Sequence, residues 1–267
     1  MKIDCKKYAQ EILDEAKIVP NKKTLAILSV GDDPASQSYI KGKIKDCEYC
    51  GVPYRHIQCR PRNLRAAIKK QNADPEVGGV IIQLPLPGEP SENEDYYLSL
   101  VDPAKDVDGF CKNSPFMPCT PEGIMRLLYR ELGFLIGKTA LVIGRGRLVG
   151  KPMARLLLDA DCTVTNAHSQ TRNLPELLRV ADIVVSGVGK PGVVDLQCCK
   201  PGAVVIDAGI SRTQEGKLVG DCFGSHKGLK VTPVPGGVGL MTRAMLMRHM
   251  ATISSSKMDE GQKYAID

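Results

Sequence analysis

The segment from residue 137 to residue 169 constrains the fold of this 267-residue chain more than any other segment. It opens with a short apolar run of β type at 140–143, and glycines follow at positions 144, 146 and 150. Apolar residues at helical spacing come next, and a β-branched run at 163–165 closes the segment. Strand, glycine turn, helix and strand in this order form the βαβ unit that a dinucleotide-binding turn requires.

Glycine is suited to this turn for a physical reason. Glycine lets backbone N–H groups approach a pyrophosphate at the helix N-terminus, where the helix dipole favours negative charge. Pro152 suits the first helical turn, because its missing N–H costs little there. The spacing alone, G-x-G-x-x-x-G, is one residue longer than the usual fingerprint and also fits an ordinary glycine turn of an α/β protein. The flanking strand and helix favour the dinucleotide interpretation.

The end of the second strand indicates which dinucleotide binds. NAD-binding turns place an Asp or Glu about 20 residues on, where it bonds the ribose 2′-hydroxyl. Residues 166–172 hold no carboxylate, whereas Arg145 lies in the turn and Ser169 and Arg172 follow the strand. Cations and a hydroxyl without a competing anion suit a 2′-phosphate. The sequence therefore favours NADP over NAD.

Composition narrows the class of protein. No apolar run reaches membrane length and no signal peptide precedes the first predicted helix, so we expect a cytoplasmic protein without a membrane partner. Ten cysteines without regular spacing favour reduced thiols, and the lone pair Cys47 and Cys50 is better read as helix-packed thiols than as a metal site. A net charge of +6, spread without basic blocks, fits anionic small molecules at least as well as nucleic acid. We expect neither a metal nor a nucleic-acid partner.

The first half of the chain alternates helices and strands. The pattern predicts helices over 4–17 and 36–50 and through the sixties, and strands over 25–30, 54–59 and 77–82, with Ser36 capping the second helix. Tyr39 and Lys43 are four residues apart on that helix and share one face. At this spacing alone they are more often surface neighbours than a catalytic pair.

Two polar groups stand out after the buried strand at 77–82. Gln83 lies at the carboxyl end of this strand, where open α/β sheets place ligand contacts, although it could equally satisfy loop backbone. Asp102, Asp106 and Asp108 then fall within seven residues. Such a cluster fits a solvated loop, a cation site or a single carboxylate aimed at a ligand. A calcium loop is not expected, because the rest of its pattern is missing.

The second half continues the alternation. Thr120 and Pro121 predict an N-cap and the start of a helix to about residue 132, and strands are expected at 183–186 and 203–207. A rigid glycine-rich loop at 231–239 precedes a methionine-rich helix over 241–252, whose methionines suit core packing. A loose polar tail is expected from about Ser254. We expect one domain over 1–119 plus 241–267 and a Rossmann-type, doubly wound parallel-sheet domain over 120–240.

Taken together, these segments resemble the bifunctional methylenetetrahydrofolate dehydrogenase/methenyltetrahydrofolate cyclohydrolase family. The likeness covers nearly the whole chain and carries eight motifs in the family's order. They are PASQSYIKGK, GGVIIQLPLP, KDVDGF, PCTPEGI, the GRG…VGKPMA turn, TVTNAHSQT, DAGI and TPVPGGVG.

The resemblance implies an α/β fold of two lobes with a cleft between them, an N-terminal catalytic domain and an NADP-binding domain. It implies a homodimer that oxidises 5,10-methylenetetrahydrofolate with NADP+ and hydrolyses the methenyl product to 10-formyltetrahydrofolate. Catalytic roles fall on Lys43, the lysine of the cyclohydrolase step, on Tyr39 beside it and on Gln83, which hydrogen-bonds it. Substrate contacts fall on Tyr39, Asp108, Pro235, Gly236 and Gly237. Cofactor contacts fall on Gly144, Arg145, Gly146, Val149, Gly150, His168, Ser169 and Ile210.

Some positions depart from the family pattern. The loop at 110–118 is shorter than usual and the region before Tyr39 is trimmed, while Gly146 stands where serine is common and Leu240 where proline is common. Three rival interpretations are a monofunctional folate dehydrogenase, a two-lobed dehydrogenase of shikimate type, and a catalytically silent nucleotide-binding protein. The run from Gln83 to Pro87 and the intact Lys43 argue against the last two.

Overall fold

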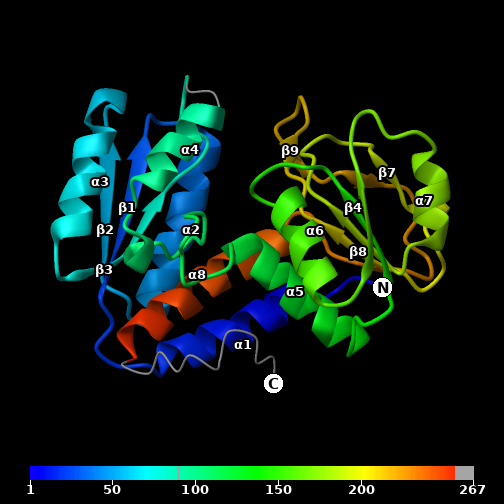
Figure 1. Ribbon diagram of the computed structural model, residues 1–267, viewed down its shortest axis with the longest axis horizontal. Coiled ribbons are helices and arrows are strands. Elements are labelled where there is room, and N and C mark those ends of the chain that lie inside the picture. Colours follow the sequence, from blue (N-terminus) through cyan, green and yellow to red (C-terminus); the bar gives the residue numbers. More distant parts are fainter. Residues whose placement is uncertain (89–90, 256–267) are drawn as a thin grey trace. The chain divides into compact units, whose positions relative to one another are not determined.

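The computed structural model describes residues 1–88 and 91–255, which form two α/β units (Figure 1). The first unit comprises residues 10–119 and 243–267, and the second comprises residues 1–9 and 120–242. The chain thus passes between the units within helices α1 (Cys5–Lys17) and α8 (Val238–Ser254) and between Cys119 and Thr120. The first nine residues belong to the second unit, whereas the sequence suggested one domain over 1–119. Most of the expected polar tail lies outside the described residues.

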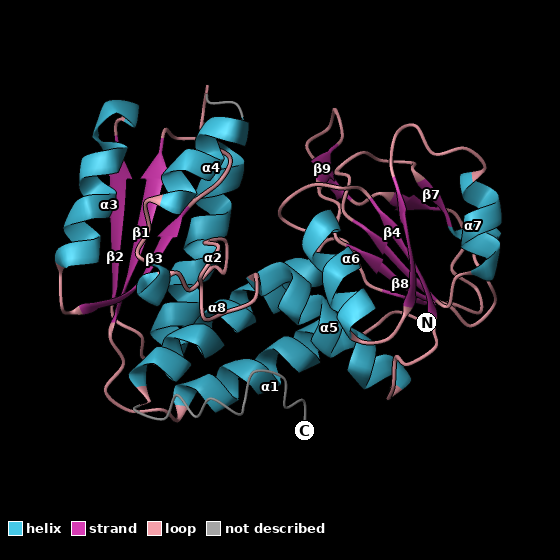
Figure 2. Cartoon of the chain, in the orientation of Figure 1, coloured by secondary structure: helices cyan, strands magenta, loops and turns pink. Residues whose placement is uncertain are grey.

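The first unit is built on a three-stranded parallel sheet. Its order is β2 (Tyr54–Cys59), β1 (Thr24–Val30) and β3 (Val77–Ile82). β3 is buried along its whole length and β1 almost so, as expected of parallel strands covered on both faces, whereas β2 is largely exposed. The helices and short 3-10 turns of this unit are α2 (Pro34–Cys50), η1 (Pro61–Asn63), α3 (Leu64–Ala73), α4 (Ser91–Ser99) and η2 (Pro103–Lys105) (Figure 2).

Helix α2 begins earlier than the sequence suggested. Asp33 is the N-cap residue and its carboxylate accepts a hydrogen bond from the Ser36 backbone N–H at 2.7 Å, while Pro34 occupies the first turn. The prediction of Ser36 as the cap is therefore wrong, because Asp33 and Pro34 together satisfy the preferences of the helix start. The helix ends at Gly51, whose φ of +65° is the left-handed conformation that glycine adopts without strain.

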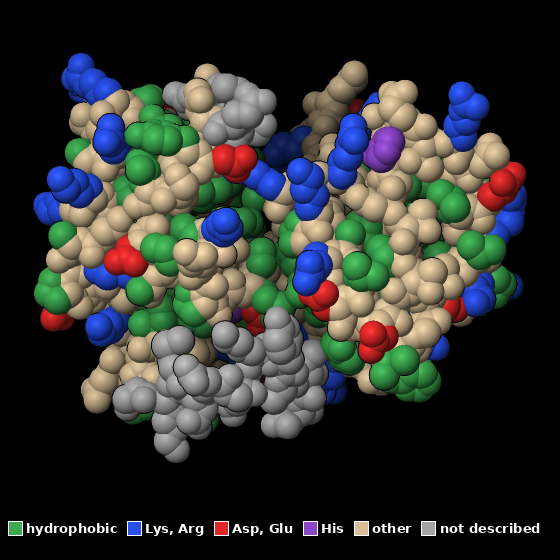
Figure 3. Space-filling model, in the orientation of Figure 1, with side chains coloured by type: hydrophobic (Ala, Val, Ile, Leu, Met, Phe, Trp, Pro, Cys, Tyr) green, Lys and Arg blue, Asp and Glu red, His purple; other side chains and the backbone are tan. Residues whose placement is uncertain are grey.

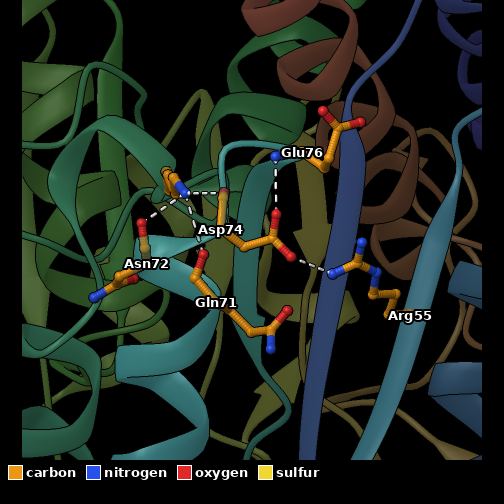
Figure 4. A network of polar contacts seen from close by, with 6 residues as sticks. Arg55, Gln71, Asn72, Asp74 and Glu76 are labelled. Carbon is orange, nitrogen blue, oxygen red and sulfur yellow. Dashed lines mark hydrogen bonds and ion pairs between the residues drawn. The ribbon is translucent and has the colours of Figure 1, made fainter.

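A polar network fastens the 102–108 segment to the end of α3 (Figure 4). Lys105 Nζ donates to the backbone carbonyls of Gln71, Asn72 and Asp74 at 3.1, 2.7 and 2.7 Å. These carbonyls lie at a helix C-terminus, which a cation stabilises. The Asp74 carboxylate in turn accepts from Arg55 and from the Glu76 backbone N–H. The network fixes the path of the chain that leads to Asp108.

The second unit contains a five-stranded parallel sheet in the order β12-β8-β6-β4-β5. The chain runs from β4 to β5 on one side and then to β6 on the other, so the strand order reverses at β4. This is the doubly wound pattern that the sequence predicted. Its elements are α5 (Cys119–Leu132), β4 (Thr139–Ile143), α6 (Gly150–Asp159), β5 (Thr163–Ala167), α7 (Leu174–Val180), β6 (Ile183–Ser186), η3 (Leu196–Cys198), β8 (Val204–Asp207) and β12 (Lys230–Val231).

Short elements complete the second unit. β9 (Ser211–Arg212) pairs antiparallel with β10 (Leu218–Val219), and β7 (Val194–Asp195) pairs parallel with β11 (Cys222–Phe223). Lys2 forms a parallel bridge with Val231, so the start of the chain lies beside the edge strand β12. Helix α5 begins at Cys119, one residue before the predicted cap Thr120, and α8 is longer at both ends than predicted.

The described surface carries charge of both signs. On the face shown in Figure 3, Lys and Arg side chains are scattered over both units, with acidic side chains among them. Within the described residues, no helix is long and apolar enough to span a bilayer.

Candidate active site

Lys43 and Gln83 meet at the carboxyl edge of the first unit's sheet. The chain runs from β1 to β2 on one side and returns to β3 on the other, so this strand order also reverses, at β1. Such a point collects ligand-binding side chains. Helix α2, which follows β1, carries Lys43, and Gln83 follows β3 directly. Lys43 Nζ donates to Gln83 Oε1 at 3.2 Å, and both side chains are buried.

The orientation of the Gln83 amide is fixed by a second hydrogen bond. Its Nε2 donates to the Leu84 backbone carbonyl at 2.7 Å, which leaves Oε1 facing Lys43. The backbone N–H of Gln83 donates to the Leu28 carbonyl and so continues the strand pairing. Of the two roles that the sequence left open, Gln83 therefore fills the loop-backbone one with one end of its amide, while the other end holds Lys43.

Tyr39 and Asp108 complete the surroundings of Lys43. The Lys43 Nζ lies 5.1 Å from the centroid of the Tyr39 ring, a cation–π distance, as the four-residue spacing on α2 permits. Burial raises the pKa of the Asp108 carboxyl, and the positive charge of Lys43 acts in the opposite direction. The structure thus brings together a lysine, its amide partner, an aromatic face and a carboxylate.

The three aspartates of the 102–108 segment have separate roles. Asp102 caps η2 by accepting from the Ala104 N–H at 3.0 Å. Asp106 is buried and accepts from the Gly109 and Cys111 N–H groups at 3.0 and 2.6 Å. Two of the three are therefore loop caps, whereas the pKa of the Asp108 carboxyl is lowered by the nearby charge of Lys43 against the larger effect of burial. The geometry favours the single-carboxylate interpretation over a cation site.

Arg243 forms an ion pair with a residue of α2, and the sequence did not indicate this contact. Its Nε lies 2.8 Å from Asp46 Oδ2, and the guanidinium covers Gly42, where a Cβ would lie 1.9 Å from Arg243 Nη1. Only a residue without a side chain leaves room for this ion pair beside Lys43. A glycine inside an otherwise helical pattern was the available signal.

The cysteine pair of α2 has no reactive character. Cys47 and Cys50 are both buried, and burial raises the pKa of Cys47 to about 12 and that of Cys50 to about 11. All ten cysteines fall within the described residues and are free thiols. The two α2 thiols therefore pack as apolar groups.

The glycine turn of the second unit has the shape that a pyrophosphate requires. Gly144 has a φ of +106°, and a Cβ on Gly150 would lie 2.3 Å from the Gly144 carbonyl oxygen. A Cβ on Gly146 would meet nothing within 4 Å, so the turn is open at this position. The turn opens α6, a helix of ten residues, and the positive end of the helix dipole favours an anion there. These residues fit a dinucleotide phosphate.

The segment at the far end of β5, residues 166–172, holds no carboxylate that could accept from a ribose 2′-hydroxyl. Asn166 donates its amide to the Val142 and Gly144 carbonyls at 2.9 and 2.7 Å, and so braces the glycine turn. Arg145 and Ser169 are exposed, whereas His168 is half-buried and accepts from the Gln170 N–H through Nδ1. A cation and a hydroxyl near a turn without a carboxylate fit the 2′-phosphate of NADP.

The remaining predicted residues lie in the loops of the second unit. Val149 is next to Gly187, since a Cβ on that glycine would approach Val149 Cγ1 to 2.8 Å. Ile210 is exposed after β8. Pro235 and Gly236 are exposed between β12 and α8, and a Cβ on Gly237 would lie 2.1 Å from the Pro233 carbonyl oxygen.

Both units match models of one protein family. The model of the tetrahydrofolate dehydrogenase/cyclohydrolase catalytic domain matches residues 3–108, and the model of the NAD(P)-binding domain of the same family matches residues 118–258. Bifunctional protein FolD 2 of Ectopseudomonas mendocina is 46% identical over 92% of this chain and 89% of its own length.

Solved structures agree with the family models. A bifunctional FolD methylenetetrahydrofolate dehydrogenase/cyclohydrolase from Campylobacter jejuni has a TM-score of 0.89 and 36% identity, covering 95% of this chain and 98% of its own. The Trypanosoma brucei enzyme, in complex with NADP cofactor and inhibitor, has a TM-score of 0.86 and 30% identity, covering 95% and 97%. Shikimate dehydrogenase of Aquifex aeolicus covers 90% of this chain and all of its own with a TM-score of 0.54, but at 14% identity it shares the fold alone. The chain therefore belongs to the tetrahydrofolate dehydrogenase/cyclohydrolase family.

Proposed function

We propose that this protein oxidises 5,10-methylenetetrahydrofolate to the methenyl form with NADP+ and hydrolyses that product to 10-formyltetrahydrofolate. The observation that carries the proposal is the buried hydrogen bond between Lys43 Nζ and Gln83 Oε1, in a chain of this family. A buried lysine whose hydrogen-bond acceptor is an uncharged amide suits proton transfer better than one in a direct salt bridge would, because an amide oxygen holds the lysine proton less tightly than a carboxylate does.

In the oxidation step the protein binds and orients its substrate. Asp108 accepts hydrogen bonds from the paired N–H groups of the pterin, and Tyr39 packs beside the ring. NADP+, when bound, accepts the hydride from the methylene carbon. Holding two reactants in register can lower a barrier by roughly 7–11 kcal/mol, so this step needs positioning more than it needs an acid or a base. Pro235, Gly236 and Gly237 are the proposed further substrate contacts.

In the hydrolysis step Lys43 moves protons. Water attacks the methenyl carbon and Lys43 takes one proton from it. The bond between that carbon and N5 then breaks, Lys43 returns its proton to N5, and the remaining hydroxyl proton is released to solvent as the formyl group forms. Gln83 keeps the ammonium or amine of Lys43 directed at the reacting carbon, because its own amide is fixed by Leu84. Tyr39 shields the lysine from solvent on one side.

The second unit binds the cofactor. Gly144, Gly146 and Gly150 are the proposed contacts to the pyrophosphate, and Arg145 and Ser169 are the proposed contacts to the 2′-phosphate. Val149, His168 and Ile210 are the proposed contacts along the rest of the dinucleotide.

An absorbance assay with 5,10-methylenetetrahydrofolate tests the two activities together. The wild type should reduce NADP+ with little build-up of the methenyl product. Lys43→Met should abolish hydrolysis and leave appreciable hydride transfer, so the methenyl absorbance should persist. Lys41→Met, an exposed neighbour on the same helix, is the matched control and should behave as wild type. Hydrolysis that survives Lys43→Met would refute the role of this lysine, and lasting methenyl accumulation by the wild type would favour a monofunctional dehydrogenase.

Arg145→Ala tests the cofactor assignment. Loss of this cation should raise the KM for NADP+ much more than the KM for NAD+, because only NADP+ carries the 2′-phosphate. Arg179→Ala, an exposed arginine on α7, is the control and should leave both constants unchanged. Equal increases for the two cofactors in Arg145→Ala would remove Arg145 from the 2′-phosphate site.

We also propose a cytoplasmic homodimer. The exposed apolar side chains of Phe134, Ile136 and Leu158 in the second unit offer a surface for a second copy of the chain. The backbone hydrogen bond from Gly137 to Asp161 holds their two segments next to each other. Sedimentation equilibrium of the purified protein should give the mass of two chains, and the mass of one chain would rule the dimer out.

A further inference from the structure

Asp221 is a fully buried carboxylate that the proposed mechanism does not use. Its Oδ2 accepts from the Ser186 hydroxyl at 2.7 Å and from the Val188 N–H at 2.8 Å, and its Oδ1 accepts from the Lys190 N–H at 2.8 Å. All three donors belong to the end of β6 and the loop that follows it. A carboxylate accepts only, so it matches three converging donors that no neutral side chain of similar size would satisfy.

Asp207, at the end of β8, holds the segment that carries Asp221. Its Oδ1 accepts from the N–H groups of Gly209 and Asp221, both at 3.0 Å, and its Oδ2 accepts from the Cys222 N–H at 2.9 Å. The arrangement is reciprocal and tight. A Cβ on Gly209 would lie 2.0 Å from Asp221 Oδ1, and a Cβ on Gly220 would lie 2.1 Å from Asp207 Oδ2.

The loop held by Asp221 is in contact with the glycine turn. Gly187 lies between Ser186 and Val188, and a Cβ on it would approach Val149 Cγ1 to 2.8 Å. A Cβ on Gly144 would in turn lie 3.2 Å from the Gly187 carbonyl oxygen. The Gly187 N–H donates to the Ile143 carbonyl at the end of β4. Asp221 thus fixes the loop that forms the second wall of the point where the strand order reverses.

We propose that Asp221, held by Asp207, is a positioning residue for the dinucleotide. It holds the 186–190 loop and the start of the segment after β8 at the carboxyl edge of the sheet, beside the glycine turn. This inference rests on the proposed function, because it assigns the turn to NADP. Asp221 touches neither cofactor nor substrate. It acts through its three donors in the 186–190 segment, which lies next to the glycine turn.

The test is Asp221→Asn in the full-length protein. Asparagine keeps the shape but places an NH2 group against at least one donor, so the loop loses one or more of its anchors. Leaving a buried donor unsatisfied at this site should raise the Kd for NADP+, measured by calorimetry, and the KM for NADP+ by about tenfold. Cyclohydrolase activity, assayed directly with methenyltetrahydrofolate, should stay at the wild-type level, because Lys43 and Gln83 belong to the first unit.

A matched control removes a similar anchor from the opposite edge of the same sheet. Asp182, at the amino end of β6, accepts from the Thr139 N–H at 2.9 Å and pairs with Lys200. Asp182→Asn should leave the Kd for NADP+ unchanged. A second, milder variant is Ser186→Ala, which removes one donor to Asp221 and should raise the same Kd about two- to fivefold, in line with the loss of one hydrogen bond.

The outcomes separate a positioning role from a general structural one. An unchanged Kd for NADP+ in both Asp221→Asn and Ser186→Ala overturns the inference, and so does an equal rise in Asp182→Asn. Should Asp221→Asn fail to fold, Ser186→Ala decides alone. The Kd for NAD+ should rise by the same factor as that for NADP+, whereas Arg145→Ala changes their ratio. If the wild-type protein binds neither cofactor, the proposed function itself has failed.

Discussion

Gly42 is a position where one added methyl group should have a large effect for its size. It precedes Lys43 on α2, and a Cβ there would lie 1.9 Å from Arg243 Nη1 and 2.9 Å from Arg243 Cζ. Gly42→Ala therefore has to expel the Arg243 side chain. That side chain is only 22% exposed and is held by Asp46, whose side chain is 8% exposed. The substitution thus breaks an ion pair that is largely shielded from solvent.

Two opposing terms set the magnitude. Alanine stabilises a helix interior by about 1 kcal/mol relative to glycine. Breaking a buried ion pair by removing one partner costs about 3–5 kcal/mol, which partial exposure of the arginine reduces to about 2–3 kcal/mol here. The ion-pair term is larger, so Gly42→Ala should lower the free energy of unfolding by about 1–2 kcal/mol.

The loss should depend on pH. Burial raises the pKa of the Asp46 carboxyl and the charge of Arg243 lowers it, so removing Arg243 raises the pKa further. Because the folded-state pKa then lies above the unfolded value of about 3.9, the ionised Asp46 costs stability at neutral pH, and protonation relieves that cost as the pH falls. Destabilisation by Gly42→Ala should be full at pH 7 and shrink as the pH falls through the raised pKa.

A double-mutant cycle with Arg243→Ala, followed by urea denaturation, tests this reasoning. Once Arg243 is truncated, nothing obstructs the methyl group at position 42. Gly42→Ala should then stabilise the protein by about 1 kcal/mol instead of destabilising it. The same loss of stability with and without Arg243 would refute the argument, because the effect could not then arise from the guanidinium.

Two further perturbations test the surroundings of Asp108. Lys105→Met removes three hydrogen bonds to the end of α3, so it should lower the free energy of unfolding by about 2 kcal/mol and raise the KM for folate. The control Lys69→Met, on the exposed face of α3, should change neither quantity in the same urea titration and activity assay. Because burial raises the pKa of Asp108, folate binding through its carboxylate should weaken on acidification at a higher pH than for an ordinary aspartate. Lys43→Met removes the opposing positive charge, so the pH below which the dehydrogenase kcat/KM falls should rise further. If that pH did not change, Asp108 would not be the group whose protonation lowers kcat/KM.

Local patterns predicted the elements that carry the site. The buried strands β1 and β3 are continuous apolar runs bounded by turn residues, and the glycine turn lies between a strand and a helix, so both could be recognised within about 20 residues. Helix α4 was not predicted, because its sequence SENEDYYLS has no apolar periodicity.

Contacts between side chains that are far apart in the sequence were much harder to predict. The sequence alone left Lys43 as a surface neighbour of Tyr39, because its partner Gln83 is 40 residues away and only the strand order brings the two together. The three aspartates at 102–108 looked alike, and only their hydrogen bonds separate two caps from Asp108. Asp221 gave no signal, since its donors, two backbone N–H groups and the Ser186 hydroxyl, lie more than 30 residues away, and in sequence it looks like any loop aspartate.

The pairing of the chain's first residues with β12 has a consequence for synthesis. The Ile3 N–H donates to the Val231 carbonyl, and the Val231 N–H donates to the Met1 carbonyl, across more than 200 residues of chain. At about 5–20 residues per second, a ribosome needs roughly 10–50 s to make that length, and during this time the first segment has no partner. The first unit's sheet, by contrast, is complete once residue 82 has emerged. The second unit therefore closes this edge of its sheet last, and until β12 emerges, β8 is the edge strand open to strands of other nascent chains.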